Sequence, residues 1–126
     1  MLVKKTYISK SKIPNAGLGL FEGEKILKGE KVWVNHPCSE KVYQPDEWDA
    51  LPKEFKNSIE MYVYKSDGLY RINIDNSRHF NHSVTPSVIM DDDGNNVAVS
   101  DLCIGDEITC DYSLFYDSDW LSKTLT

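Results

Sequence analysis

The sequence lacks a long apolar run. No stretch approaches the roughly 20 apolar residues of a membrane-spanning helix, and the first six residues lead into no long apolar core of the kind a signal peptide has. We therefore expect a cytoplasmic protein without a membrane partner.

Cysteine is scarce, and its three positions are scattered. Cys38, Cys103 and Cys110 are odd in number and form no C-x-x-C pair, which argues against a disulfide framework and against a zinc site. Reduced thiols fit a cytosolic setting. We expect no bound metal.

Basic residues are also in deficit. The formal net charge is −6, with 14 Lys and Arg against 20 Asp and Glu. A nucleic-acid-binding domain would present a basic face, so direct nucleic-acid binding is not expected. The negative balance suits a basic partner such as a lysine-rich peptide.

Length and pattern indicate one mainly β domain spanning residues 1–126. Helical spacing over 45–59, interrupted by Pro52, predicts two short helices. The aromatic tail, 113–126, is expected to pack onto the body. Strands separated by glycine turns are predicted at 3–10, 31–35, 60–65, 69–74, 88–90, 96–100 and 108–112.

An acidic run at 91–95 raises the question of calcium. Counting from Gly94 places Ile89 at the first ligand position of an EF-hand loop and Ser100 at the position of its bidentate glutamate. Neither residue fits, so a solvated hairpin loop is the better interpretation.

Two segments carry polar or glycine-rich patterns whose role the pattern alone leaves open. The stretch from Arg78 to Ser87 is either a solvated loop or a prepared polar pocket, and composition favours the loop, although Phe80 argues against it. The glycines at 17 and 19 permit positive φ or close approach to the backbone, yet an isolated pair is more typical of a turn with a bulge.

Four short motifs nevertheless occur in one order. They are G-x-G at 17–19, K-G-E at 28–30, R-x-x-N-H-S-x-x-P at 78–86 and G-D-E-I-T-x-D-Y at 105–112. Together they resemble the SET-domain family of S-adenosylmethionine-dependent protein-lysine methyltransferases. The resemblance runs from about Tyr7 to Trp120. In size the chain is similar to minimal viral and bacterial SET domains, which lack zinc-binding flanks.

The resemblance implies a fold of several small sheets with a C-terminal pseudoknot. A C-terminal segment would pass through a loop and lie against the N-H-S strand. Residues 36–59 would be a variable insert that helps to form the substrate groove. Knot-like threading is rare, so general topology rules do not predict it.

The resemblance also implies a cofactor site and a catalytic residue. Tyr112 matches the active-site tyrosine, Asn81 would lie near the methionine amine of the cofactor, and the His82 backbone would contact its adenine. The cofactor-binding set is Gly17, Leu18, Gly19, Arg78, Asn81 and His82.

The implied chemistry is methyl transfer to a lysine of a basic protein or peptide. A free lysine amine has a pKa of about 10.4, and a narrow apolar channel lowers that pKa because it disfavours the ammonium. The Tyr112 hydroxyl would orient the amine.

Some positions depart from the family pattern. Met90 stands where some relatives have a second active-site tyrosine, and Ser87 replaces the usual Asn after the proline. Phe115 or Tyr116 would limit how many methyl groups the channel accepts. The residues left as candidates to line the substrate channel are Tyr64, Tyr70, Phe115 and Tyr116.

Two other functions remain open. A non-catalytic peptide-binding module on the same fold is expected if the missing tyrosine is essential, whereas the presence of Tyr112, Asn81 and both glycines favours the enzyme. A Cys-His hydrolase is the weakest reading, since no pattern sets a histidine beside a cysteine. The sequence identifies neither the target protein nor the number of methyl groups transferred. A homodimer remains possible, as does localisation to a host nucleus if the protein is viral or an effector.

Overall fold

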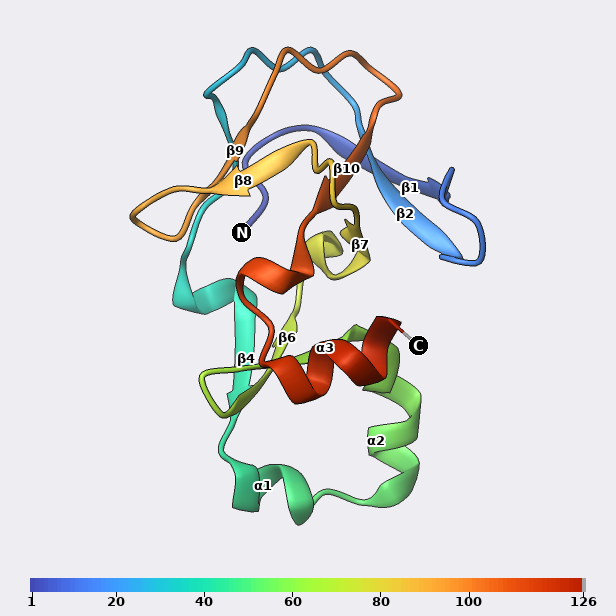
Figure 1. Cartoon of the computed structure of the whole chain (residues 1–126), viewed down its shortest axis with the longest axis vertical. Helices are drawn as coiled ribbons and strands as arrows, with labels where there is room; N and C mark the ends of the chain where they lie inside the picture. The colour runs from blue at the N-terminus through green and yellow to red at the C-terminus, as the bar shows by residue number, and fades with distance from the viewer. Residues whose placement is uncertain (126) are drawn as a thin grey trace.

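The computed structural model describes residues 1–125. Its strands form three small sheets, and short helices gather at the end opposite the sheet of β8 and β9 (Figure 1). The predicted mainly β fold with a short helical insert is confirmed.

The first sheet joins the N-terminal and C-terminal motifs. Its order is β1 (Thr6–Lys10), β2 (Leu18–Glu22), β10 (Glu107–Cys110) and β7 (Asn81–His82). β10 runs parallel to β7, with Thr109 opposite Asn81 and Cys110 opposite His82. This pairing sets the C-terminal motif beside N-H-S, as the expected pseudoknot requires; the threading itself stays a prediction.

The other two sheets have three strands each. One contains β3 (Lys31–Trp33), β9 (Asn96–Ala98) and β8 (Val88–Met90), and the other β4 (Glu40–Tyr43), β6 (Leu69–Asn73) and β5 (Val63–Ser66). Asp67 and Gly68 join β5 to β6 with φ of 53° and 75°. Two successive positive φ angles are typical of the tight hairpin that an Asp-Gly pair predicts.

The helices follow the predicted break at Pro52. α1 (Pro45–Asp49) and α2 (Lys53–Ile59) lie on either side of it. The predicted strand 60–65 is wrong at its start, because a 3₁₀ turn, η2 (Glu60–Tyr62), continues the helical backbone of α2 before pairing with β6 begins. The remaining elements are η1 (Pro37–Ser39), η3 (Asn76–His79), η4 (Tyr112–Leu114) and α3 (Ser118–Leu125).

The C-terminal tail lies against the third sheet. The Trp120 indole N–H donates to the Val63 carbonyl over 3.1 Å, and its ring meets Tyr70 edge-on at 5.7 Å. The tail thereby covers β5 and β6, with α3 lying across them (Figure 1).

The main core lies between the first and second sheets. Its fully buried members are Leu20, Ile26, Val32, Val88 and Ile108. Phe80 and Cys110 pack on this cluster, and Tyr112 contacts it from the side. The core therefore holds the N-H-S segment and the C-terminal tyrosine in fixed positions.

The acidic loop holds its own backbone. The Asp91 carboxylate accepts N–H bonds from Asp93 and Asn95. Among residues 1–125, no cluster of three or more histidine, cysteine or acidic side chains is arranged to hold a metal ion. No helix in the same range is long and apolar enough to cross a membrane.

One buried carboxyl predicts an unusual pH dependence. Glu22 is fully buried, neither of its carboxyl oxygens has a hydrogen-bond partner within the described residues, and burial together with Glu24 and Asp106 raises its pKa to about 7. The folded state thus keeps a proton that the unfolded chain loses above about pH 4.3, so stability falls as pH rises from about 4.5 to 8.

Glu22→Gln is expected to remove this loss. The variant should be more stable than the parent by about 1–3 kcal/mol at pH 8 and nearly equal to it at pH 4.5 in urea unfolding. Glu54→Gln, on an exposed carboxyl of α2 that does not affect the Glu22 pKa, serves as the control. An equal difference at both pH values would show that Glu22 does not titrate as described.

Candidate functional site

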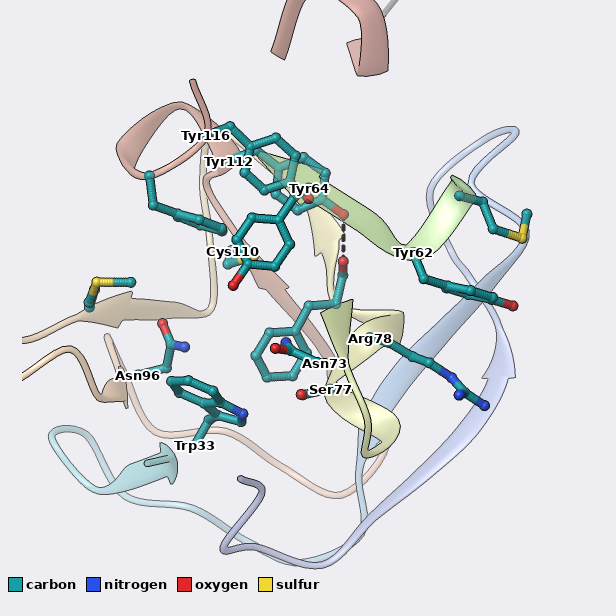
Figure 2. Close-up of a pocket in the computed structure, with 14 residues that line it drawn as sticks. Trp33, Tyr62, Tyr64, Asn73, Ser77, Arg78, Asn96, Cys110, Tyr112 and Tyr116 are labelled. Carbon is teal, nitrogen blue, oxygen red and sulfur yellow. Dashed lines mark hydrogen bonds between the residues drawn. The ribbon is translucent and has the colours of Figure 1, made fainter. Parts of the chain in front are cut away.

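Three hollows lie in series on one side of the core. The first, here the turn cavity, is lined mainly by the glycine turn and the N-H-S segment, including Ala16, Gly17, Leu18, Arg78, Phe80, Asn81 and Tyr112. The second, the aromatic channel, shares Arg78, Phe80 and Tyr112 with it (Figure 2). The third, the outer groove, shares Tyr64, Met90 and Tyr116 with the aromatic channel.

The glycine turn contributes backbone to the turn cavity. Gly17 has a φ of 76°, in the left-handed region where a side chain is strained. Gly17 and Leu18 line the cavity, and the Leu18 carbonyl accepts a hydrogen bond from Asn81 Nδ2 at 3.0 Å. The turn and the N-H-S segment are therefore held together directly.

Gly19 lies against Glu107 and Asn81. It is absent from the lining of the turn cavity. A Cβ at this position would lie 2.6 Å from Glu107 Oε2 and 3.2 Å from Asn81 Nδ2. The missing side chain leaves room for these two groups.

Glu107 is the residue that sequence reasoning missed in this region. Its Oε2 accepts from Ser11 Oγ at 2.8 Å and from Asn81 Nδ2 at 3.1 Å, and its Oε1 accepts from the Lys12 backbone N–H at 2.8 Å. Since Leu18 and Glu107 take both amide hydrogens of Asn81, the side-chain oxygen of Asn81 remains as its acceptor. The signal in the sequence that could have identified Glu107 is its place in the G-D-E-I-T-x-D-Y motif.

Tyr112 lies where the turn cavity meets the aromatic channel. Its backbone N–H donates to His82 Nδ1 at 3.1 Å, and its hydroxyl donates to the Phe80 carbonyl at 2.5 Å (Figure 2). Burial raises the pKa of the Tyr112 hydroxyl, which therefore stays protonated near neutral pH and acts as a donor.

His82 packs against Tyr112 and accepts a hydrogen bond from its backbone N–H. Its ring lies 5.1 Å from the tyrosine ring, and Asp111 Oδ1 lies 3.8 Å from the same Nδ1. The side chain of His82 does not line the turn cavity. Any contribution of His82 to a ligand there would come from its backbone.

Arg78 borders both hollows. Its guanidinium lies over the Tyr62 ring, 5.3 Å from the centroid, an arrangement that favours cation–π attraction. Burial and the Arg78 charge together lower the pKa of the neighbouring His79.

Stacked aromatic rings form one wall of the channel. Tyr116 stacks on Tyr112 at 4.4 Å and on Tyr64 at 5.1 Å, while Phe115 meets Tyr64 and Tyr112 edge-on. Three of the four channel candidates, Tyr64, Phe115 and Tyr116, are thus brought together.

The fourth candidate, Tyr70, does not reach the channel. It stacks on Trp48 at 5.0 Å and is absent from the channel lining. In the β5–β6 hairpin Tyr64 faces Arg71, whereas Tyr70 faces Lys65. Because directly opposed residues share a face and neighbours alternate, the two tyrosines point to opposite faces of the sheet.

Tyr64 and Tyr116 both bring a hydroxyl group to the channel in addition to that of Tyr112. The Tyr64 hydroxyl donates to Glu40 Oε2 at 3.4 Å, and Glu40 pairs with Arg71 at 2.6 Å. Burial raises the pKa of Tyr64 as well. Met90, from β8, lines the channel with a thioether instead of a hydroxyl.

Two polar side chains at the channel were not anticipated from sequence. Trp33 Nε1 and Asn73 Oδ1 are both buried and have no hydrogen-bond partner among residues 1–125. An unpaired buried donor or acceptor costs about 1–3 kcal/mol. Both residues line the aromatic channel (Figure 2).

Cysteine chemistry is disfavoured at this site. Cys110 lines the channel, and burial raises the pKa of its thiol to about 12. The thiolate is the nucleophilic form, so this buried thiol is inert at neutral pH. Cys38 and Cys103 are exposed and do not line the channel.

Comparison with solved structures identifies the fold. The chain is similar to a proposed histone methyltransferase of Plasmodium falciparum, with 23% identity, a TM-score of 0.58, and coverage of 88% of this chain and 95% of that one. It is also similar to Polycomb Repressive Complex 2 of Chaetomium thermophilum in two states. The autoinhibited apo form gives 20% identity and a TM-score of 0.66 over 97% of this chain and 17% of that chain. The form bound to S-adenosylmethionine gives 21% identity and a TM-score of 0.63, and the match covers 97% of this chain and 16% of that chain.

The chain therefore has the SET-domain fold that its four motifs predict. It spans about a sixth of the matched polycomb chains. Sequence comparison alone finds no matching protein-family profile and no matching curated protein.

Proposed function

We propose that this protein transfers a methyl group from S-adenosylmethionine to a lysine side chain of a basic protein. The observation that carries the proposal is the position of Tyr112, whose protonated hydroxyl lies between the turn cavity and the aromatic channel. The similar structure of Polycomb Repressive Complex 2, which is described as bound to S-adenosylmethionine, supports the choice of cofactor.

The turn cavity fits the polar methionine end of that cofactor. Its α-ammonium needs acceptors, and Asn81 retains its side-chain oxygen because Leu18 and Glu107 hold both amide hydrogens. Its carboxylate needs a cation, which Arg78 supplies from the cavity wall. Gly17 adopts its positive φ without strain and leaves the turn open, since no side chain projects there.

The reaction asks the protein mainly for alignment. S-adenosylmethionine, when bound, supplies an activated methyl group. The Tyr112 hydroxyl is fixed by its bond to the Phe80 carbonyl and keeps its oxygen lone pairs for a group at the junction, and the stacked rings of Tyr64, Tyr112 and Tyr116 exclude water from the amine's approach. Such a channel disfavours the charged ammonium, and correct alignment can lower a barrier by about 7–11 kcal/mol.

The outer groove suits a basic substrate. It is lined by Asp67, Asp117 and the ion pair of Glu40 with Arg71, so its charged groups are acidic on balance, and the whole chain carries a net charge of −6. β8 is an edge strand whose Met90 borders the groove. An extended peptide could add to this edge and lower its lysine into the channel.

Glu107→Gln should weaken cofactor binding through Asn81. Ser11, Lys12 and Asn81 all donate hydrogen bonds to the Glu107 carboxylate. A glutamine has only one side-chain oxygen, so its NH₂ group would face at least one of these donors and that hydrogen bond would be lost. We expect affinity for S-adenosylmethionine to fall about tenfold, or about 1.4 kcal/mol, in calorimetric titration. Glu30→Gln, on a carboxylate that caps a distant turn, is the control. Unchanged affinity for Glu107→Gln would remove Glu107 from the site.

A methyl-transfer assay tests the function itself. Purified protein is incubated with methyl-labelled S-adenosylmethionine and a panel of basic proteins, and labelled residues are mapped by mass spectrometry. Label on lysine is the expected result. A folded protein that binds the cofactor but labels no lysine would favour the alternative, a non-catalytic peptide-binding module. This alternative is tested because Met90 lines the channel where some relatives have a second active-site tyrosine.

A further inference from the structure

The cation that lines the turn cavity, Arg78, is an exposed side chain of η3. A free arginine side chain samples many rotamers, so an exposed guanidinium contributes little to the binding of an anion unless neighbouring groups hold it in place. Two other residues that line the same cavity, Tyr62 and His79, contact Arg78.

His79 and Tyr62 contact different parts of the Arg78 side chain. The guanidinium lies over the face of the Tyr62 ring, 5.3 Å from its centroid, and Figure 2 shows the two side chains next to each other. His79 is only 7% exposed, and its ring meets the Tyr62 ring edge-on at 5.4 Å. The exposed arginine is therefore packed against a buried histidine and a tyrosine that themselves contact each other.

The contact between His79 and Arg78 depends on where the imidazole carries its proton. Arg78 Nε–H donates to His79 Nε2 over 3.5 Å. Because arginine offers only donors, Nε2 must be the acceptor, and the single proton of the neutral ring lies on Nδ1. A distance of 3.5 Å is at the long limit of a hydrogen bond, so the bond itself is weak. The larger effect is that a proton on Nε2 would set a second cation directly against the guanidinium.

The surroundings of His79 favour its uncharged form. Burial first, and then the Arg78 charge, lower the pKa of His79, so the ring is neutral at pH 7. Among its neighbours, Glu60 pairs with Lys123, and the Asp75 carboxylate accepts from backbone N–H groups. The ionisable groups on the elements packed around His79, and across the cavity from it, are Glu22 on β2, Tyr70 and Arg71 on β6, Glu60 and Tyr62 on η2, Asp75 and Arg78 at η3, and Tyr112.

We propose that His79 and Tyr62 are positioning residues that hold the Arg78 guanidinium at the wall of the turn cavity, and that His79 does so in its uncharged, Nδ1-protonated form. Arg78 is thereby ordered before an anionic group arrives. That this group is the carboxylate of the cofactor rests on the proposed methyltransferase function. A histidine that merely fills space beside Tyr62 would leave the Arg78 side chain unaffected.

Side-chain NMR tests the positioning without any ligand. The nitrogen resonances of the His79 ring report its tautomer, and the Nε–H resonance of Arg78 reports its contact. We expect the Nδ1–H tautomer at pH 7 and an Arg78 Nε–H signal that shifts as His79 titrates, with a midpoint below the usual range of histidine.

Two histidine variants make this readout specific. His79→Phe keeps a ring beside Tyr62 and should abolish the pH-dependent shift of Arg78. His36→Gln, on an exposed histidine at the start of η1, should leave the shift unchanged. An Nε2–H tautomer at pH 7, or an Arg78 signal that does not respond when His79 titrates, would overturn the proposal.

A double-mutant cycle measured by calorimetry with S-adenosylmethionine links the positioning to binding. We expect affinity to fall about tenfold in Arg78→Gln and about fivefold in His79→Phe. Adding His79→Phe to Arg78→Gln should cost less than about twofold, because the residue that His79 positions is already gone. Equal losses from His79→Phe in both backgrounds would show that His79 does not act through Arg78. No binding by folded wild type would refute the cofactor assignment, whereas the NMR readout would still decide whether His79 holds Arg78.

Discussion

Replacing Tyr112 with phenylalanine is expected to lower the rate of methyl transfer about 10- to 100-fold, or about 1.4–2.7 kcal/mol in the barrier. The ring remains to stack on Tyr116 at 4.4 Å, and the backbone N–H still donates to His82. Only the protonated hydroxyl at the junction is lost, together with its bond to the Phe80 carbonyl. Single-turnover assays with labelled cofactor measure the change.

Cofactor affinity separates this effect from a general disturbance. Affinity for S-adenosylmethionine should stay within about twofold, because the groups assigned to the methionine end are untouched. Tyr43→Phe removes a hydroxyl from a ring that packs on Trp48, away from the channel, and should leave the rate unchanged. Normal turnover by Tyr112→Phe would exclude its hydroxyl from the mechanism.

Gly19→Val is the second substitution with a large expected effect. Its Cβ would meet Glu107 Oε2 at 2.6 Å and Asn81 Nδ2 at 3.2 Å, so the network that fixes the Asn81 amide must shift. We expect a loss of about 1–3 kcal/mol in stability and at least about a tenfold loss in affinity for S-adenosylmethionine.

Gly23→Ala provides a matched control. Its Cβ would lie 3.0 Å from the Lys5 backbone, outside the lining of the turn cavity. This variant should lose stability in urea unfolding yet bind the cofactor normally. If folded Gly19→Val also bound normally, the link between Gly19, Glu107 and the cavity would be wrong.

Local chemistry made much of the fold predictable. Pro52 ends one helix and begins the next because it cannot continue α1, and the Asp67-Gly68 pair forms the expected hairpin. β4 and α3 were not predicted. Each is short, and each is stabilised by partners distant in sequence, β4 by β6 and α3 through Trp120 on β5.

The site was predictable where one motif supplies the residue. The N-H-S and D-Y motifs led to Asn81 and Tyr112, and β7 and β10 bring these segments together. The Tyr64 and Tyr70 alternatives could have been separated by the two-residue loop, which fixes the register and hence the faces. No motif marks Trp33 and Asn73, whose buried Nε1 and Oδ1 have no hydrogen-bond partner in the part of the chain that the structure describes.

Calorimetric titration with S-adenosylmethionine tests the central claim most directly. Wild-type protein should bind about one cofactor per chain, and folded Asn81→Ala should bind at least about tenfold more weakly, since it loses the acceptor that Leu18 and Glu107 orient. Equal affinity in the two proteins, or no heat of binding from a folded wild type, would contradict the assignment of the turn cavity as the cofactor site.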